Sequence, residues 1–168
     1  MGFKKTSDLI AVSFGVSESA VNTYTQEEIA LQLDVLNNEI FVVLAVDLNP
    51  GVPSAIAGLD TNVRAAITST SATAMSNLSQ SNCIAVAQLD IRAAGFADGG
   101  VSFSRMANES YTGDLDYIAL IATNNFFVAI EGAGNTGGKT LNGRLYGYRA
   151  KADASTYAAL VQSEVLSA

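Results

Sequence analysis

The chain has 168 residues and a mass of 17.4 kDa, which corresponds to a single domain. Hydrophobic residues make up 49% of it and charged residues only 15%, so it can bury enough apolar surface to fold and is not intrinsically disordered. It has no His, one Cys (Cys83) and a net charge of −7. These features exclude His-dependent catalysis, His-ligated metals and intramolecular disulfides, and they argue against nucleic-acid binding.

Segments with the composition of β-strands begin at residue 28. Residues 28–34 alternate between polar and apolar side chains, and residues 40–46 form a continuous β-branched and aromatic run. Asn37 and Asn38 supply turn residues between them, so the two segments are expected to form a β-hairpin. Further strands are expected at residues 63–71, where the Ala content leaves a helix open, and at 83–92 and 101–106.

The C-terminal half continues the same pattern. Residues 117–122 and 126–130 have the composition of two strands and are expected to pair across the short turn between them. A glycine-rich turn, residues 132–138, then precedes a last strand that is expected to end near Lys151.

Strands separated by turn signals along almost the whole chain predict an all-β fold. There is no repeat and no linker, so we expect a single-domain β-sandwich over residues 1–168. Eight or so strands suit a jelly roll. Residues 1–8 are expected to form an N-terminal arm. Residues 152–168 are expected to form a short C-terminal helix or an extended tail, with Asp153 or Ser155 as a helix cap.

No run of about 18 apolar residues occurs, so the sequence predicts no membrane-spanning helix. Asp8 interrupts the N-terminus between the basic residues and a short apolar run, which does not fit a secretory signal. Synthesis in a cytoplasm is therefore expected.

A phosphate-binding loop is the sharpest motif in the chain. Residues 127–140 have the pattern of a strand followed by a glycine-rich loop that ends in Gly138, Lys139 and Thr140. The required spacing puts a glycine where the chain has Ala133, and a strand pattern follows where such loops need a helix. We therefore expect a glycine-rich hairpin loop here rather than a nucleotide site.

Acidic turns offer an alternative function. Asp98 and the pair Asp114 and Asp116 carry oxygen ligands suited to calcium, although neither turn has the twelve-residue loop with its closing Glu. With Tyr111 and Tyr117 they suggest a carbohydrate- or ligand-binding β-sandwich module that could depend on calcium. The chain has no Trp to form a sugar platform, and we predict no catalytic residue, no metal site and no cofactor.

Basic and aromatic side chains gather on the last strand. A subunit interface and a solvated strand edge explain this group equally well. The candidate interface residues, including two lysines of the arm, are Lys4, Lys5, Arg144, Tyr146, Tyr148, Arg149 and Lys151.

Residues 39–47, 124–132 and 141–153 are similar to strands of virion shell proteins. In these segments, and in its acidic, small-residue composition without His or Trp, the chain resembles capsid and capsid-decoration proteins of icosahedral DNA viruses. The resemblance implies an eight-stranded jelly roll without catalysis, made in a host cytoplasm and located in the virion. It further implies self-assembly into trimers to hexamers or a larger shell, alone or with other capsid proteins, with the arm and the tail as extensions between subunits.

Overall fold

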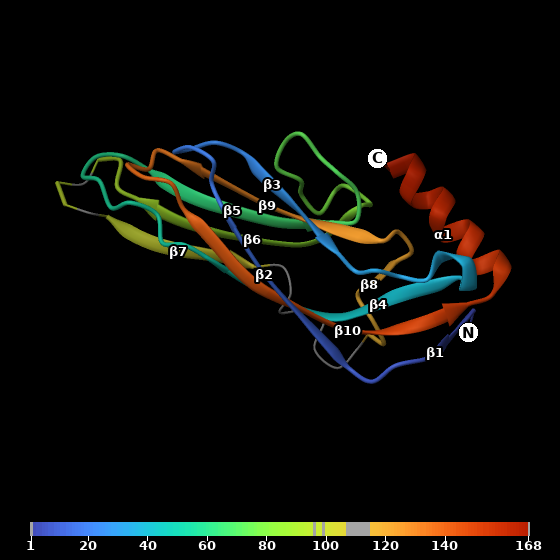
Figure 1. Ribbon diagram of the computed structural model, residues 1–168. Helices are drawn as coiled ribbons and strands as arrows, with labels where there is room; N and C mark the ends of the chain where they lie inside the picture. Colours follow the sequence, from blue (N-terminus) through green and yellow to red (C-terminus); the bar gives the residue numbers. More distant parts are fainter. Residues whose placement is uncertain (1, 96, 99, 107–114, 168) are drawn as a thin grey trace.

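The computed structural model describes residues 2–95, 97–98, 100–106 and 115–167. Its strands form two antiparallel sheets stacked as a sandwich, with a helix at one end of the molecule (Figure 1). Sheet A contains β1 (Phe3–Lys5), β2 (Ile10–Ser17), β4 (Glu39–Pro50), β8 (Ala119–Ile121) and β10 (Thr140–Ala152). Sheet B contains β3 (Thr25–Ala30), β5 (Thr61–Thr68), β6 (Cys83–Arg92), β7 (Val101–Met106) and β9 (Asn125–Ala133). The remaining elements are a 3-10 turn, η1 (Val35–Asn37), and the helix α1 (Ala154–Ser167).

The strand pairing is that of a jelly roll. Strands distant in sequence pair in a nested series: β2 with β10, β3 with β9, β4 with β8, and β5 with β6, all antiparallel. The chain is therefore one long folded ribbon rolled into two sheets, with β1 and β7 added at the sides. The predicted all-β sandwich with jelly-roll topology is confirmed.

Three of the predicted local pairings are wrong. β3 lies in sheet B and β4 in sheet A, so the expected hairpin around Asn37 and Asn38 does not form. β8 and β9 also lie in opposite sheets, and the glycine-rich segment after β9 crosses to sheet A instead of closing a hairpin. The β3–β4 connection shows why the first hairpin does not form. Leu31 and Leu33 of this connection are buried in the core between the two sheets, so the chain passes from one sheet to the other.

The main core lies between the two sheets. Phe14 of β2 and Phe126 of β9 meet edge to face, with ring centroids 5.9 Å apart, and so join sheet A to sheet B. The largest fully buried side chains of this core are Phe41, Phe126, Ile67, Ile121, Ile130, Leu141 and Leu145.

A second apolar cluster lies on the outer face of sheet A, beneath α1. Tyr157, Leu160 and Val161 of the helix pack on a cluster that includes Ile40 and Ala150 of the sheet. Asp153 caps the helix, as one of the two predicted candidates, because its Oδ1 accepts a hydrogen bond from the Thr156 amide at 2.8 Å.

Both ends of the described chain are held on its own sheet. Phe3 of β1 is the register partner of Ala152 of β10, and the Asp153 amide donates to the Gly2 carbonyl at 2.8 Å. The resemblance implied that the arm and the tail extend between subunits. In the structure, residues 3–5 of the arm form a paired strand, and residues 154–167 of the tail form a helix packed on the sheet. In the described part of the chain, no helix is long and apolar enough to cross a membrane.

Candidate interaction surfaces and a polar pocket

The strand that carries most of the candidate interface residues is not a sheet edge. β10 lies inside sheet A, between β4 on one side and β2 and β1 on the other. Its backbone is therefore engaged on both sides, which removes the solvated-edge interpretation. Contacts to another subunit from β10 would have to use its side chains.

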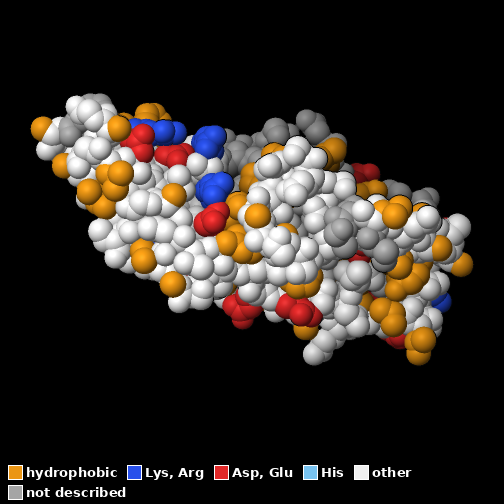
Figure 2. Space-filling view, turned by 90° about the horizontal axis from the view of Figure 1, so that it is seen from above, with side chains coloured by type: hydrophobic (Ala, Val, Ile, Leu, Met, Phe, Trp, Pro, Cys, Tyr) orange, Lys and Arg blue, Asp and Glu red, His pale blue; other side chains and the backbone are white. Residues whose placement is uncertain are grey.

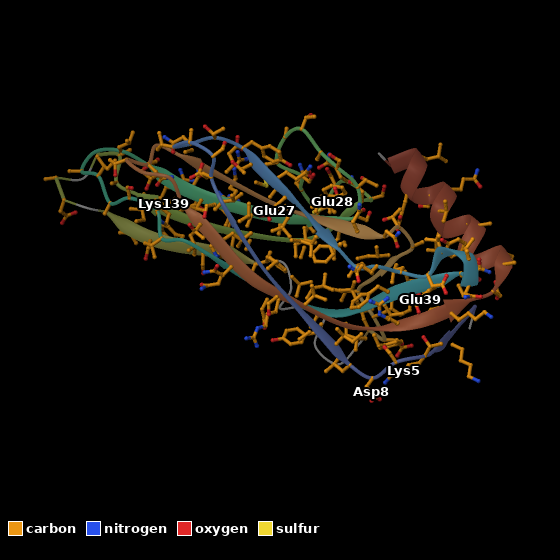
Figure 3. All side chains as sticks on the ribbon, in the orientation of Figure 1. Lys5, Asp8, Glu27, Glu28, Glu39 and Lys139 are labelled. Carbon is orange, nitrogen blue, oxygen red and sulfur yellow. The ribbon has the colours of Figure 1, made fainter. Side chains whose placement is uncertain are left out.

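Four of the candidates point to the outer face of sheet A. Arg144 is exposed and Tyr146 half-buried, and both line a shallow groove of about 440 Å³ with Ser13 and Asp47. Tyr148 packs at the margin of the cluster beneath α1, and Lys5 Nζ lies 5.0 Å from its ring centroid. Figure 3 shows Lys5 with Asp8 at the rim of the molecule where β1 leads into β2.

The other three candidates alternate to the opposite side. Lys4 and Lys151 are exposed register partners on β1 and β10. Arg149 is half-buried and already has partners within the chain, because its guanidinium donates to the carbonyls of Leu31 at 2.7 Å and Gln32 at 3.1 Å. It also forms a 2.8 Å ion pair with Glu39, which lies at the helix end of the molecule (Figure 3). Arg149 therefore connects the β3–η1 segment to sheet A.

The free strand edges differ in charge. β3, at the edge of sheet B, carries the exposed Glu27 and Glu28 (Figure 3). β2, at the edge of sheet A, has eight residues and no charged side chain or proline, and among the described residues it pairs only with β10. Charged side chains are a common protection of an edge against pairing with another chain. By this criterion β3 is protected and β2 is not.

The backbone amides of the glycine-rich segment, residues 132–138, and of the neighbouring Lys139 include two that are bound by a carboxylate of the chain itself. The buried Glu18 accepts hydrogen bonds from the amides of Thr23 at 2.9 Å, Gly132 at 3.0 Å and Lys139 at 2.8 Å. A strand, β10, begins at Thr140, as the sequence predicts. A phosphate-binding loop needs free amides and a helix N-terminus, and this segment provides neither at these positions.

The residues behind the calcium alternative lie partly outside the described chain. Tyr111 and Asp114 are not described, and Asp116 is exposed. Tyr117 packs edge to face on Phe3, with ring centroids 5.7 Å apart, and Asp98 accepts a bond from the Gly100 amide at 3.2 Å. Among the described residues, no three acidic or Cys side chains are grouped closely enough to hold a metal ion.

A polar row that the sequence did not indicate crosses the outer face of sheet B. Glu131, Arg64, Gln88 and Arg105 are successive register partners on β9, β5, β6 and β7. Arg64 forms an ion pair with Glu131. Because each residue comes from a different strand, no spacing within the chain could reveal the row.

The segment between β5 and β6 covers part of this row. Met75, Ser76 and Asn77 lie over Arg64, Gln88 and Arg105, which leaves a half-open cavity of about 290 Å³. The Gln26 side chain holds the start of the segment by donating to Ser71 Oγ at 2.9 Å and accepting from the Ala72 amide at 2.8 Å. Asn82 holds its end through a 2.6 Å bond to Thr70 Oγ1.

Two further ion pairs lie on this face. Arg105 Nε lies 3.5 Å from Asp90 Oδ2, and Arg92 Nη1 lies 3.2 Å from Asp60 Oδ2. The amides of Ala94 and Ala93, followed by Arg92, lower the pKa of Asp60. In Figure 2 most visible Lys and Arg side chains form one group with acidic side chains beside them, and most of the remaining surface is uncharged.

No family model and no curated protein matches the chain. Among solved structures, a chain of Desmodium yellow mottle tymovirus is similar over 88% of this chain and 91% of its own, with 14% identity and a TM-score of 0.33. The tailspike protein gp49 of Acinetobacter baumannii bacteriophage Fri1, a capsular polysaccharide depolymerase, is similar over 80% of this chain and 19% of its own, with 11% identity and a TM-score of 0.19. At these TM-scores neither likeness carries an inference about function.

Proposed function

We propose that this chain is a non-enzymatic structural subunit of a virion, which assembles with copies of itself as a capsid shell or capsid-decoration subunit. The observation that carries the proposal is the unprotected edge of β2. This strand presents eight uncharged residues at the side of sheet A, whereas the corresponding edge strand of sheet B carries Glu27 and Glu28. An edge of this kind is a template for a strand of another chain.

Small side chains favour pairing at this edge. Ala11, Ser13 and Gly15 of β2 are exposed, and small exposed side chains let the backbone of a second copy approach closely. A strand added beside β2 would extend sheet A from one subunit into the next. Repetition of such a contact closes rings or shells when the rotation between subunits permits it.

Two further features support a virion role. The jelly roll is the architecture of many viral capsid domains, although lectin domains and cupins share it. The acidic, small-residue composition and the strand segments resemble those of capsid and capsid-decoration proteins, as described above. The candidate residues Arg144 and Tyr146, exposed and half-buried on the outer face of sheet A, lie beside β2 and would flank such a contact.

The test compares a charge on the β2 edge with the same charge on the β3 edge. Ala11 and Ala30 are both exposed alanines on edge strands, so Ala11→Glu and Ala11→Lys have Ala30→Glu and Ala30→Lys as matched controls. We expect wild type and both Ala30 variants to assemble, as measured by light scattering coupled to size exclusion and by negative-stain microscopy. Both Ala11 variants should need about tenfold higher protein concentration, whatever the sign of the added charge.

A wild type that stays monomeric at high concentration and in varied salt, and that coats no preformed particle, would contradict the proposal. Equal assembly of the Ala11 and Ala30 variants would show that β2 is not the contact. The second candidate function, a ligand-binding β-sandwich module, is favoured by the polar cavity on sheet B.

A further inference from the structure

We propose that the shallow groove on the outer face of sheet A, over β2, β10 and β4, binds a neutral saccharide through one or two of its pyranose rings. The groove lies on the face of the sheet, whereas the assembly contact proposed above uses the backbone edge of β2. Binding of the saccharide therefore does not depend on assembly.

A row of polar side chains crosses this groove. Ser13 of β2, Arg144 of β10 and Asp47 of β4 are successive register partners, and all three are exposed and line the groove. Opposite charges on directly opposed strand positions usually attract each other. In the part of the chain that the structure describes, however, neither Arg144 nor Asp47 forms an ion pair or a side-chain hydrogen bond. A charged donor and a charged acceptor are thus both free to bind a ligand.

Two side-chain amides form the next row. Asn142 of β10 and Asn49 of β4 are register partners, and both are exposed and line the groove. On β2 this row has Gly15, and a Cβ atom there would lie 3.2 Å from Oδ1 of Asn142, so the Asn142 amide lies close over the glycine. Neither amide is hydrogen-bonded to another described residue. Each can donate and accept, as the hydroxyl groups of a sugar require.

Tyr146 adds an aromatic ring beside these polar groups. It is half-buried, lines the groove and lies two residues from Arg144, on the same face of β10. Its register partners on both sides, Ala11 and Ala45, are small and leave space next to the ring. A pyranose ring has C–H groups on its faces and hydroxyl groups around its rim. The tyrosine ring suits the C–H groups, and the neighbouring polar side chains suit the hydroxyls.

The charge and the shape of the groove favour a neutral, extended ligand. Arg144 and Asp47 balance each other, and the other polar side chains of the groove carry amides or hydroxyls. No excess charge is therefore present to select an anionic sugar. The groove has a volume of about 440 Å³ and is open to solvent, so it admits part of a saccharide chain rather than enclosing a small apolar molecule.

Four neutral disaccharides, namely maltose, cellobiose, lactose and chitobiose, are the probes, and ligand-observed saturation-transfer NMR is the measurement. This signal can be read for a monomer and for an assembled particle, so a failure of binding is distinguishable from a failure of assembly. We expect saturable transfer to at least one disaccharide, with a Kd on the order of 1 mM. Sorbitol, a polyol without a ring, should bind at least about tenfold more weakly.

Three variants test the groove. Asp47→Ala and Arg144→Ala each remove an exposed group without a partner in the described chain, so both should unfold like wild type but bind the disaccharide about tenfold more weakly. Tyr146→Leu keeps an apolar side chain but lacks the flat ring, and should weaken binding to a similar extent. Asp8→Ala and Lys151→Ala are the matched controls, because both residues are exposed and lie outside the groove.

Four results would overturn the proposal. They are the absence of saturable transfer to all four disaccharides, equal binding of sorbitol, tighter binding of glucuronate than of any disaccharide, and unchanged binding in both the Asp47 and the Arg144 variants. An equal loss of binding in the two control variants would likewise place the saccharide outside the groove.

Discussion

The carboxylate of Glu18 accepts a hydrogen bond from the backbone amide of Lys139, 121 residues further along the chain. With its bonds to the Thr23 and Gly132 amides, this one side chain joins the β2–β3 loop to the β9–β10 segment. Lys139 lies at the end of the molecule opposite α1 (Figure 3). A carboxylate of the chain itself thus lies against the glycine-rich segment whose sequence partly resembles a phosphate-binding loop.

Replacement of Glu18 by Ala should destabilise the protein by about 3 kcal/mol, because three backbone amides, one of them that of the buried Gly132, lose their acceptor. Glu18→Gln keeps one acceptor oxygen and should lose about half as much. Urea denaturation measures both values. Glu27→Ala, at an exposed position, is the control and should stay within about 0.5 kcal/mol of wild type. A Glu18→Ala variant as stable as this control would show that these three hydrogen bonds do not stabilise the fold.

Glu164 is expected to make the stability dependent on pH. Its side chain is buried under α1, Oε1 accepts from the Ala122 amide at 3.0 Å, and Oε2 has no partner. Burial raises the pKa of this carboxyl, so the folded chain holds the proton more tightly than the unfolded chain. Its contribution to stability is therefore complete at acidic pH and is lost as the pH rises through the raised value.

Glu164→Gln keeps the acceptor for Ala122 and removes the titration. The variant should match wild type near pH 4, close to the ordinary pKa of a glutamate, where Glu164 is protonated in the folded chain. Near pH 8, above that pKa, the variant should be the more stable of the two. Urea midpoints followed by the helical circular-dichroism signal measure the difference. A constant difference across this range would show that Glu164 does not titrate under the helix.

Arg149 should behave as a residue that stabilises the fold. Arg149→Ala removes two bonds to backbone carbonyls and the ion pair with Glu39, and we expect a loss of about 2 kcal/mol. Lys at this position cannot reproduce the forked donors and should recover only part of the loss. Lys151→Ala is the matched control on the same strand and is expected to be neutral. If the two alanine variants unfold at the same urea concentration, Arg149 does not connect the β3–η1 segment to sheet A.

The extent of some strands was predictable from the sequence because it depends on local pattern, whereas β2 was not expected as a strand and the strand expected at 28–34 lies at Thr25–Ala30. The expected strands at 83–92 and 101–106 coincide with β6 and β7, and Asp153 caps α1 as its side chain suggests. Strand pairing was not predictable in the same way. Asn37 and Asn38 are good turn residues, yet the burial of Leu31 and Leu33 between the layers directs the chain from one sheet to the other.

The candidate sites were predictable only in part, for the same reason. Arg144 and Tyr146 alternate outward on β10, as a strand requires. The sequence could not show that Arg149 connects two parts of the fold, because its carbonyl acceptors come from residues 31 and 32. Arg64, Ser76 and Arg105 line one cavity because β5, β6 and β7 pair in register and the segment between β5 and β6 folds over them. No spacing within the sequence could indicate this.

The nested pairing of the jelly roll sets the order in which the chain can fold. Ser17 of β2 is the register partner of Thr140 of β10, and these residues are 123 positions apart. During synthesis on the ribosome, β2 therefore stays unpaired while β3 to β9 emerge. The entropic cost of closing this long loop must be met before the hydrogen bonds between β2 and β10 can form. In a nascent or refolding chain, both sides of β2 are open to other molecules.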